Sequence, residues 1–302
     1  MKSQKESRSF LQKLLQNSPE LPFEPTLLPM LFAVTRENSI ASTDDLVALV
    51  ERSQNLTSRV LSLANSAVYG LEFKVSTLHR AISILGIREI RLLVVMAGMA
   101  SIVQKVKLPG GFDVTALWRH QLTVAFIART LAAELGAPEG ARGDAAKEGD
   151  RLGTAPDEAY VAGLLHDIGK VFFAASQPGL WEEVEAHWKE SGRHYFEAED
   201  ACWGMDHALI GAEVLHHWKL PLSLTEPINW HHAPELAPAH KMETRLLAAA
   251  NLIAHTGLDA EGSLPAEAAM LLPETSDFAA LGTAVADCLA NASFEALGTL
   301  VQ

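Results

Sequence analysis

Helical spacing of apolar residues extends along nearly the whole chain, whereas the strict alternation typical of strands is hard to find. One clear stripe consists of Val161, Leu164, Leu165 and Ile168, which follow one another at i, i+3, i+4 and i+7. No segment of about 20 to 50 residues repeats along the chain. The sequence therefore predicts an all-α protein.

Helix-start and helix-stop signals are clear in the first third of the chain. Ser42 or Thr43 can cap a helix that has acidic residues in its first turn. A second helix is predicted over residues 56–64, and Gly86 is expected to separate a short helix from a long apolar one. We expect residues 1–114 to form an N-terminal helical lobe.

Residues 136–156, GAPEGARGDAAKEGDRLGTAP, contain no large apolar side chain except one leucine and are rich in Gly, Ala, Pro and charge. Such a composition gives little apolar area to offset the entropy of ordering, so we expect a mobile insertion between two helices. The flanking helices are predicted to form a second lobe over residues 115–256. A C-terminal helical extension is expected over residues 257–302.

Bulk properties narrow the function classes. The longest apolar run, Leu92 to Val103, is too short to span a membrane, and the N-terminus lacks a secretory apolar core, so we expect a soluble, cytoplasmic protein with no membrane partner. Cys202 and Cys288 form no CxxC pair, which argues against disulfides and thiolate zinc sites.

Charge is unevenly distributed along the chain. Residues 1–114 carry 13 Lys and Arg against 10 Asp and Glu, whereas residues 115–302 carry 11 against 27. The acidic second part repels a phosphate backbone, which argues against general nucleic-acid binding, and it suits a bound cation or an ordinary solvated surface. Basic residues that could contact nucleic acid lack interleaved aromatic residues; they are Lys74, Arg80, Arg88, Arg91, Lys105 and Lys107.

An adjacent histidine and aspartate lie near the end of the predicted helix that begins after the insertion. His166 and Asp167 are expected in its final turn, with Gly169 just beyond that turn and Lys170 next. Both side chains can reach one divalent ion there, because the helix dipole and free carbonyl groups favour cations.

Further histidines occupy apolar faces or helix ends. His120 lies on the apolar stripe of its helix and therefore needs a partner. His207 is placed at a helix start, and His231 and His232 at the end of a helix that Ser223 and Glu226 would begin as a capping box.

A single histidine is more often a hydrogen-bonded or surface residue than a metal ligand, but five in such positions favour a shared site. The alternative remains that they bond to one another, to Asp167 and to buried water. The other histidines are interpreted as structural or solvent-facing: His79, His187, His194, His216, His217, His240 and His255.

The segments AYVAGLLHDIGKVFF, DHALIGAEVLHHWKLP and INWHHAPE resemble the HDOD domain of bacterial signalling proteins. The predicted N-terminal lobe also resembles the HDOD domain, because it has an asparagine-serine turn at Asn65 and Ser66 and a leucine-glycine-arginine stretch. It departs from the family pattern at Ser53 and Gln54, which replace the usual aspartate-proline. The resemblance covers residues 20 to 255. It implies a multi-helix bundle similar to HD domains, preceded by the N-terminal helical lobe.

HDOD domains are related to HD phosphohydrolases and to HD-GYP phosphodiesterases of cyclic di-nucleotides. Imidazole-rich sites with one carboxylate suit iron, manganese, nickel or zinc, and this resemblance implies one or two divalent ions, iron or manganese first. If the protein is an enzyme, Lys170 is the implied catalytic lysine. The implied metal ligands are His120, His166, Asp167, His207, His231, His232 and Asn251. Ala116 replaces a metal-binding glutamate of some HD-GYP enzymes, and the GYP loop is missing. Asn251 stands at the closing position of the HD-GYP pattern, which is the last metal-ligand position along the chain and where an aspartate is expected.

Most HDOD domains are regarded as regulatory modules, so the resemblance implies a signalling protein with a protein partner and without efficient catalysis. The alternative is a metal-dependent phosphohydrolase or phosphodiesterase that acts on a nucleotide or cyclic nucleotide, and a phosphorylated small molecule is then the expected ligand. Fold alone does not decide between the two functions.

Overall fold

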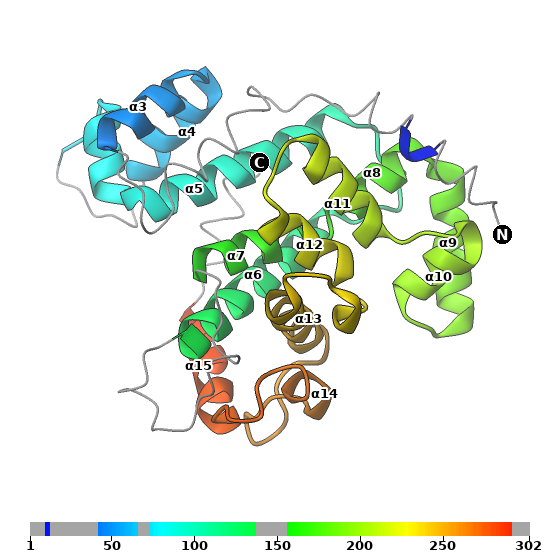
Figure 1. The fold of residues 1–302 in the computed structure, drawn as a ribbon. Coiled ribbons are helices and arrows are strands. Elements are labelled where there is room, and N and C mark those ends of the chain that lie inside the picture. Colours follow the sequence, from blue (N-terminus) through cyan, green and yellow to red (C-terminus); the bar gives the residue numbers. More distant parts are fainter. Residues whose placement is uncertain (1–9, 13–41, 66–72, 137–155, 292–302) are drawn as a thin grey trace. The chain divides into compact units, whose positions relative to one another are not determined.

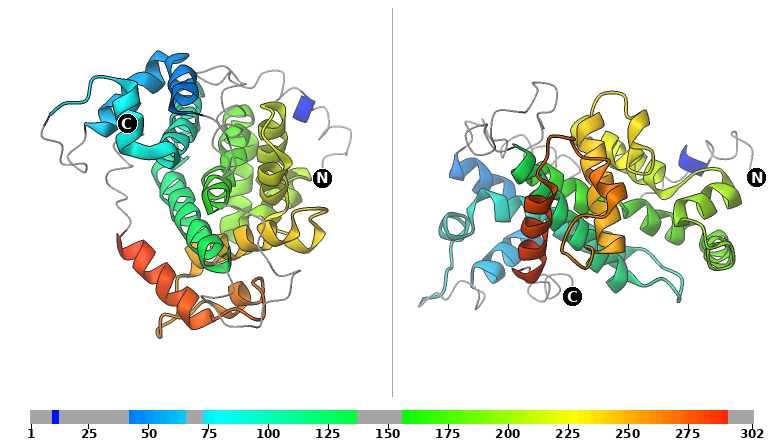
Figure 2. Two further views of the ribbon diagram at one scale, coloured as in Figure 1. Left: turned by 60° about the vertical axis from the view of Figure 1, so that its left-hand side comes forward. Right: turned by 90° about the horizontal axis from the view of Figure 1, so that it is seen from below.

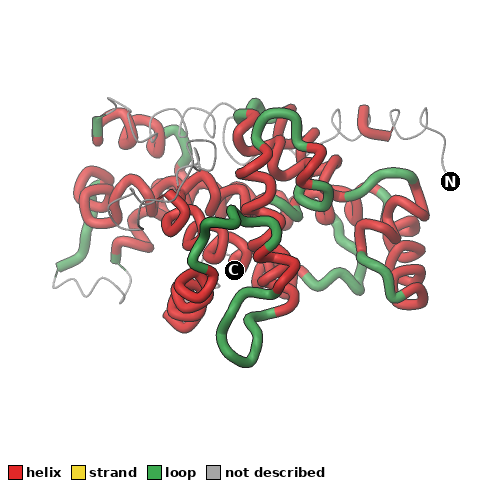
Figure 3. The backbone as a smooth tube through the Cα atoms, turned by 60° about the horizontal axis from the view of Figure 1, so that its bottom comes forward, coloured by secondary structure: helices red, strands yellow, loops and turns green. Residues whose placement is uncertain are grey.

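Helices provide all the regular secondary structure in the part of the chain that the computed structural model describes, residues 10–12, 42–65, 73–136 and 156–291 (Figures 1 and 3). The all-α prediction is confirmed. None of the helices in these residues is long and apolar enough to cross a membrane. The helices are α3 (Thr43–Glu51), α4 (Gln54–Ala64), α5 (Leu78–Lys105), α6 (Val114–Gly136), α7 (Pro156–Leu165), α8 (Ile168–Ser176), α9 (Pro178–Ser191), α10 (Tyr195–Trp203), α11 (His207–His217), α12 (Leu222–Trp230), η4 (Pro234–Leu236), α13 (Lys241–Thr256), α14 (Ala266–Ala269) and α15 (Phe278–Asn291).

The described helices belong to two compact units. The smaller unit contains Pro19–Lys107 and therefore α3, α4 and α5. The larger unit contains Leu108–His217 and Pro221–Phe294, which include all the later helices. The predicted insertion between Gly136 and Pro156 and the predicted turn at Ser66 lie outside the described residues.

Local signals shape the smaller unit. Ser42 caps α3 in a capping box, because its hydroxyl accepts from the backbone N–H of Asp45 and the Asp45 carboxylate accepts from the backbone N–H of Ser42. Ser53 caps α4 where the HDOD pattern has aspartate. Gly86 has a positive φ of 81°, which breaks the regular geometry of α5 at the predicted position.

The side chain of Asn65 connects the end of α4 to the segment around Val75 by hydrogen bonds. Its side-chain amide donates to the carbonyl oxygens of Leu61 and Val75, and its Oδ1 accepts from the backbone N–H of Val75. These bonds satisfy polar groups at the end of α4, where helix carbonyls lack internal partners. The asparagine therefore has a structural role.

Helix α7 is the central helix of the larger unit, since every residue from 159 to 165 is buried. It packs against α6, α12 and α13, while α15 covers another part of α6 (Figure 2). At Gly163 the two helix backbones come close, because a β-carbon there would lie 2.5 Å from Cα of Ala125. This close packing of α6 and α7 brings the end of α7 beside the middle of α6.

Helices α8 to α12 pack against one another in the rest of the larger unit. Helix α11 packs against α8 and α12, and α9 packs against α8 and α10. Phe173 of α8 stacks on Trp203 of α10 with ring centroids 4.3 Å apart, and both side chains are fully buried. This stack attaches α10 to the rest of the larger unit.

Two predicted helix boundaries are wrong. Helix α7 ends at Leu165, so His166 and Asp167 lie in a turn before α8, and Gly169 lies inside α8. The apolar spacing continues across this short turn, since Ile168 at the start of α8 is buried like Leu164 and Leu165 of α7.

The predicted capping box of α12 is also wrong. The N-cap of α12 is Pro221, and no side chain caps the helix there. Glu226 instead accepts hydrogen bonds from the backbone N–H groups of Ala239 and His240, both at 2.6 Å. The tertiary position of the loop before α13 therefore decides the role of this carboxylate.

Candidate metal centre

Histidine and aspartate side chains from separate helices meet in the larger unit. They are His120 of α6, His166 and Asp167 of the turn between α7 and α8, His207 at the start of α11, and His231 and His232 at the end of α12. Their donor atoms form two groups in which all atoms lie within 4.8 Å of one another. One group contains His120, His166 and Asp167, and the other contains His207, His231 and His232.

Asp167 joins the two groups. Its Oδ1 lies 2.9 Å from Nε2 of His207 and 3.5 Å from Nε2 of His166, and its Oδ2 lies 3.8 Å from Nε2 of His120. Only 1% of Asp167 is exposed. His120, His166 and His207 therefore lie around one buried carboxylate, and His207 connects it to His231 and His232.

His166 and His231 are held by the same kind of hydrogen bond. Nδ1–H of His166 donates to the carbonyl oxygen of Gly163 at 2.8 Å, and Nδ1–H of His231 donates to that of Ile228 at 2.7 Å. Each carbonyl belongs to the helix that precedes the histidine, three residues before it. With the proton on Nδ1, the lone pair of a neutral imidazole is on Nε2.

The Nε2 atoms of His166 and His231 are buried, and neither has a hydrogen-bond partner among the described residues. A buried polar atom without a partner costs about 1–3 kcal/mol. A cation that accepts the lone pair removes this cost. These two nitrogen atoms are therefore the strongest structural indication that the cluster binds a ligand.

The protonation states suit a divalent metal. Burial lowers the pKa of His166 well below its usual value and lowers the pKa of His231 to about 3. Burial opposes ionisation of Asp167, but the surrounding histidine and lysine side chains hold its pKa well below the usual value. At neutral pH, His166 and His231 are thus neutral and Asp167 is ionised, which are the forms of these side chains that bind metals.

His207 differs from the other histidines because it lies between two carboxylates. Its Nδ1–H donates to Oε2 of Glu199 at 2.6 Å, and its Nε2 lies 2.9 Å from Asp167. Burial alone would lower the pKa of His207, but the two carboxylates outweigh burial and raise that pKa to about 9. The imidazole therefore carries a proton at Nε2 unless a cation replaces it.

His232 lies at the partly buried side of the cluster. Its Nε2 is 3.0 Å from Nε2 of His207, and its ring stacks on Phe196 with centroids 4.2 Å apart and an interplanar angle of 16°. Burial lowers the pKa of His232, so the ring is neutral. The stacked Phe196 restricts the orientation of this imidazole.

Lys170 lies beside the cluster and is partly exposed. Its Nζ is 2.6 Å from Oδ2 of Asp167 and 5.4 Å from the ring centroid of Tyr195. The ammonium group therefore compensates part of the buried negative charge. It also offers a positive charge at the edge of the cluster.

Asn251 also reaches the cluster, although it carries no charge. It belongs to α13, is 8% exposed, and its Oδ1 accepts from Nε2–H of His120 at 2.9 Å. Its carbonyl oxygen is a possible metal ligand, but a weaker one than carboxylate. The place of the closing aspartate is thus occupied by a neutral hydrogen-bond acceptor.

Two residues near the cluster were not predicted from the sequence. The ring of His255 lies 4.3 Å from that of His120, and His255 is one helical turn beyond Asn251 on α13. Glu199 is fully buried on α10, four residues before the buried Trp203. The i, i+4 spacing was a usable signal in both cases. His255 is exposed, as are His216 and His217 of α11.

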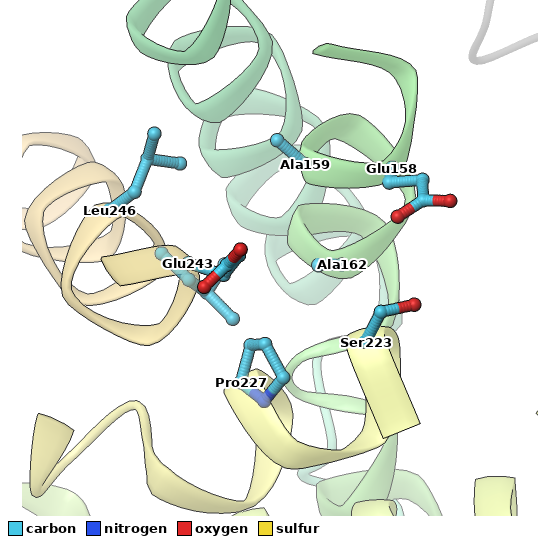
Figure 4. A pocket seen from close by; sticks show the side chains of 8 residues that line it. Glu158, Ala159, Ala162, Ser223, Pro227, Glu243 and Leu246 are labelled. Atoms are coloured by element: carbon cyan, nitrogen blue, oxygen red, sulfur yellow. The ribbon is translucent and has the colours of Figure 1, made fainter. Parts of the chain in front are cut away.

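A small surface hollow lies elsewhere on the larger unit, between α7, α12 and α13 (Figure 4). Glu158, Glu243 and Ser223 lie around it, and Pro227 and Leu246 contribute apolar lining. No residue of the histidine cluster lines this hollow. It is therefore separate from the candidate metal centre.

Comparisons with known proteins agree with the fold. A sequence model of the family described as the HDOD domain matches residues 21–234. A solved HDOD domain protein of Geobacter sulfurreducens is similar, with a TM-score of 0.71 and 23% identity, over 97% of this chain and 96% of that one. A protein of Marinobacter aquaeolei, described as a candidate signal transduction protein, has a TM-score of 0.70 and 22% identity, over 97% of this chain and 64% of that one.

Two other proteins are slightly more similar in sequence. A Shewanella amazonensis structure, described as a candidate phosphohydrolase, has a TM-score of 0.66 and 26% identity over 96% of both chains. A Treponema pallidum protein is 26% identical over 224 residues, which are 74% of this chain and 39% of the relative. This chain thus spans about two fifths of the length of that curated relative.

Proposed function

This chain belongs to the HDOD domain family, and from this premise we propose that it is a regulatory signalling module whose larger unit binds a divalent transition metal. HDOD domains are mostly regarded as regulatory modules, which supports a signalling role with a protein partner. The metal would then stabilise the arrangement of helices that the partner recognises. Efficient catalysis is not part of this proposal.

The observation that carries the metal proposal is the pair of buried Nε2 atoms of His166 and His231 that have no hydrogen-bond partner among the described residues. The residues that would hold the metal are His120, His166, Asp167, His207, His231 and His232, with Asn251 as a weaker oxygen ligand. Two groups of three donors suit one or two ions.

The donor set restricts the identity of the metal. Imidazole nitrogens predominate and one carboxylate is present, which favours iron, manganese, nickel or zinc over magnesium and calcium, because the last two prefer oxygen ligands. The resemblance to HD-GYP proteins favours iron or manganese first.

Elemental analysis tests this proposal directly. The protein is purified without an affinity metal column, and its iron, manganese, nickel and zinc contents are measured beside those of the variant His166→Ala and the control variant His216→Ala. We expect one or two metal ions per chain in the wild type and the control, and a large loss in His166→Ala. Wild-type protein that stays free of metal after incubation with each of these ions would show the proposal to be wrong.

A second function, metal-dependent phosphohydrolysis, is favoured by the description of the Shewanella amazonensis protein as a candidate phosphohydrolase. A bound divalent ion would polarise a phosphoester and activate water. In this chain Lys170 would neutralise phosphate charge at the edge of the cluster, but it is already paired with Asp167. Because Asn251 provides no negative charge at the closing position, we place this function second.

A further inference from the structure

Glu199 has a fully buried carboxylate, and His207 donates both of the hydrogen bonds that it accepts. Its Oε2 accepts from Nδ1–H of His207 at 2.6 Å and from the backbone N–H of His207 at 3.0 Å. No lysine or arginine among the described residues forms an ion pair with it. A buried negative charge is costly without compensation, so its placement next to His207 requires an explanation.

The two hydrogen bonds fix His207 in backbone and side chain together. His207 is the first residue of α11, where backbone N–H groups have no partner inside the helix, and Glu199 accepts one of them. The second bond holds Nδ1, so the ring cannot rotate freely. Its Nε2 therefore stays beside Asp167 and His232, at 2.9 Å and 3.0 Å.

The hydrogen-bond acceptor of Nδ1 differs between His207 and its neighbours in the cluster. Nδ1 of His166 and of His231 donates to a neutral backbone carbonyl, whereas Nδ1 of His207 donates to a carboxylate. A charged acceptor makes an imidazole a stronger electron donor at its other nitrogen. It also brings a second negative charge close to a cluster in which, among the described residues, Asp167 is the one candidate carboxylate ligand.

We propose that Glu199 is a positioning residue that holds the Nδ1 proton of His207 and keeps Nε2 directed toward the site of a divalent transition metal. The inference rests on the proposed metal site and names the residue that adjusts its affinity. Glu199 itself does not touch the metal. Its carboxylate compensates in part for the neutral Asn251 at the closing position of the cluster.

The variant Glu199→Gln tests this role because glutamine keeps the size and the oxygen acceptor but removes the charge. Asp200→Asn is the matched control, since Asp200 is the next residue of α10 and is exposed. Zn²⁺ and Co²⁺ are titrated into chelator-stripped protein, and the visible spectrum of the Co²⁺ form is recorded. We expect the affinity of Glu199→Gln for both ions to fall by about 10- to 100-fold, with a changed Co²⁺ spectrum, and the control to match the wild type.

A double variant separates a positioning role from a general loss of stability. In a His207→Ala background, Glu199→Gln should leave the affinity for Zn²⁺ unchanged, because the residue that it positions is absent. An equal loss of affinity in both backgrounds would overturn the inference. Unchanged affinity of Glu199→Gln, with only a lower melting temperature of the metal-free protein, would also overturn it.

A measurement on the wild type keeps the inference testable if Glu199→Gln does not fold. Nuclear magnetic resonance of the Zn²⁺-loaded protein should show a downfield Nδ1 proton on His207, and its absence would mean that Nδ1 is not held by Glu199. Failure of the wild type to bind Zn²⁺ or Co²⁺ would refute the metal site and this role together. Wild-type binding that depends on His166 but not on Glu199 would refute the positioning role alone.

Discussion

Gly169 of α8 lies directly against the backbone carbonyl oxygen of His207 of α11. A β-carbon at residue 169 would overlap that oxygen, and it would also lie 2.8 Å from the backbone nitrogen of Gly211. The two helices therefore touch through their backbones at this point. The contact keeps the turn that holds His166 and Asp167 next to the start of α11.

Gly169→Ala should destabilise the larger unit and weaken metal binding. The added methyl group meets backbone atoms that cannot rotate away, so we expect a loss of about 3 kcal/mol or more in the free energy of unfolding. Chemical denaturation measures it. Gly179→Ala in α9 is the control, because a β-carbon at Gly179 has no neighbour within 4 Å. Equal stability of both variants would mean that α8 and α11 are farther apart than described.

Removal of the metal should lower the melting temperature. A ligand present at about 100 times its dissociation constant stabilises the folded state by about 2.7 kcal/mol, which corresponds to roughly 5–10 °C for a unit of this size. Thermal denaturation with and without a chelator measures the shift. The shift should disappear in His231→Ala, since its buried Nε2 would no longer be available. A similar shift in that variant would place the metal elsewhere.

Asn251→Asp should strengthen metal binding. The new carboxylate would replace a neutral oxygen that lies 2.9 Å from Nε2 of His120. Carboxylate binds divalent ions more tightly than an amide, so we expect an increase in affinity for Mn²⁺ of roughly tenfold. Calorimetric titration checks this, with Asn251→Ala as the variant that should not bind more tightly. An unchanged affinity of Asn251→Asp would exclude residue 251 as a ligand.

Replacement of residues 137–155 by a short Gly and Ser link should leave the melting temperature nearly unchanged. This segment lies outside the described residues, and the prediction rests on its composition, which offers little apolar area to offset the entropy of ordering. The shortened variant keeps Gly136 and Pro156, at which α6 ends and α7 begins. A large decrease in melting temperature would show that the segment packs against the protein.

Hydrolysis of cyclic di-nucleotides by the purified protein should be negligible with each divalent metal. The cluster lacks the closing carboxylate, because residue 251 is asparagine, and the chain lacks the GYP loop. Product formation is followed by chromatography, with His166→Ala as the background. Metal-dependent turnover at rates usual for enzymes, lost in His166→Ala, would instead support the phosphohydrolase function.

Signals within a few residues were sufficient to predict many of the helices. The capping box of Ser42 and Asp45 and the break at Gly86 depend on contacts and backbone angles inside one short segment. Most of the residues that meet in the cluster were also identified from the sequence, because the HD pair and the later histidines follow a family pattern. Their common location was implied by that pattern and not by any local signal.

The sequence alone determined that the chain is helical, where many of the helices lie and which histidines are candidate ligands, since helical periodicity and capping act within one or two turns. Only the tertiary structure decided how these residues are used. Glu199 belongs to an acidic stretch that resembles a solvated surface, and it becomes a partner of His207 because α10 packs with its carboxylate turned into the larger unit. His166 and Asp167 lie in a turn and not in a helix, and after this turn α8 approaches the backbone of α11 at Gly169. Both outcomes depend on distances between helices that do not follow from local patterns. The i, i+4 spacing from Trp203 can indicate that Glu199 faces the core, but no local pattern of apolar residues encodes its contact with His207.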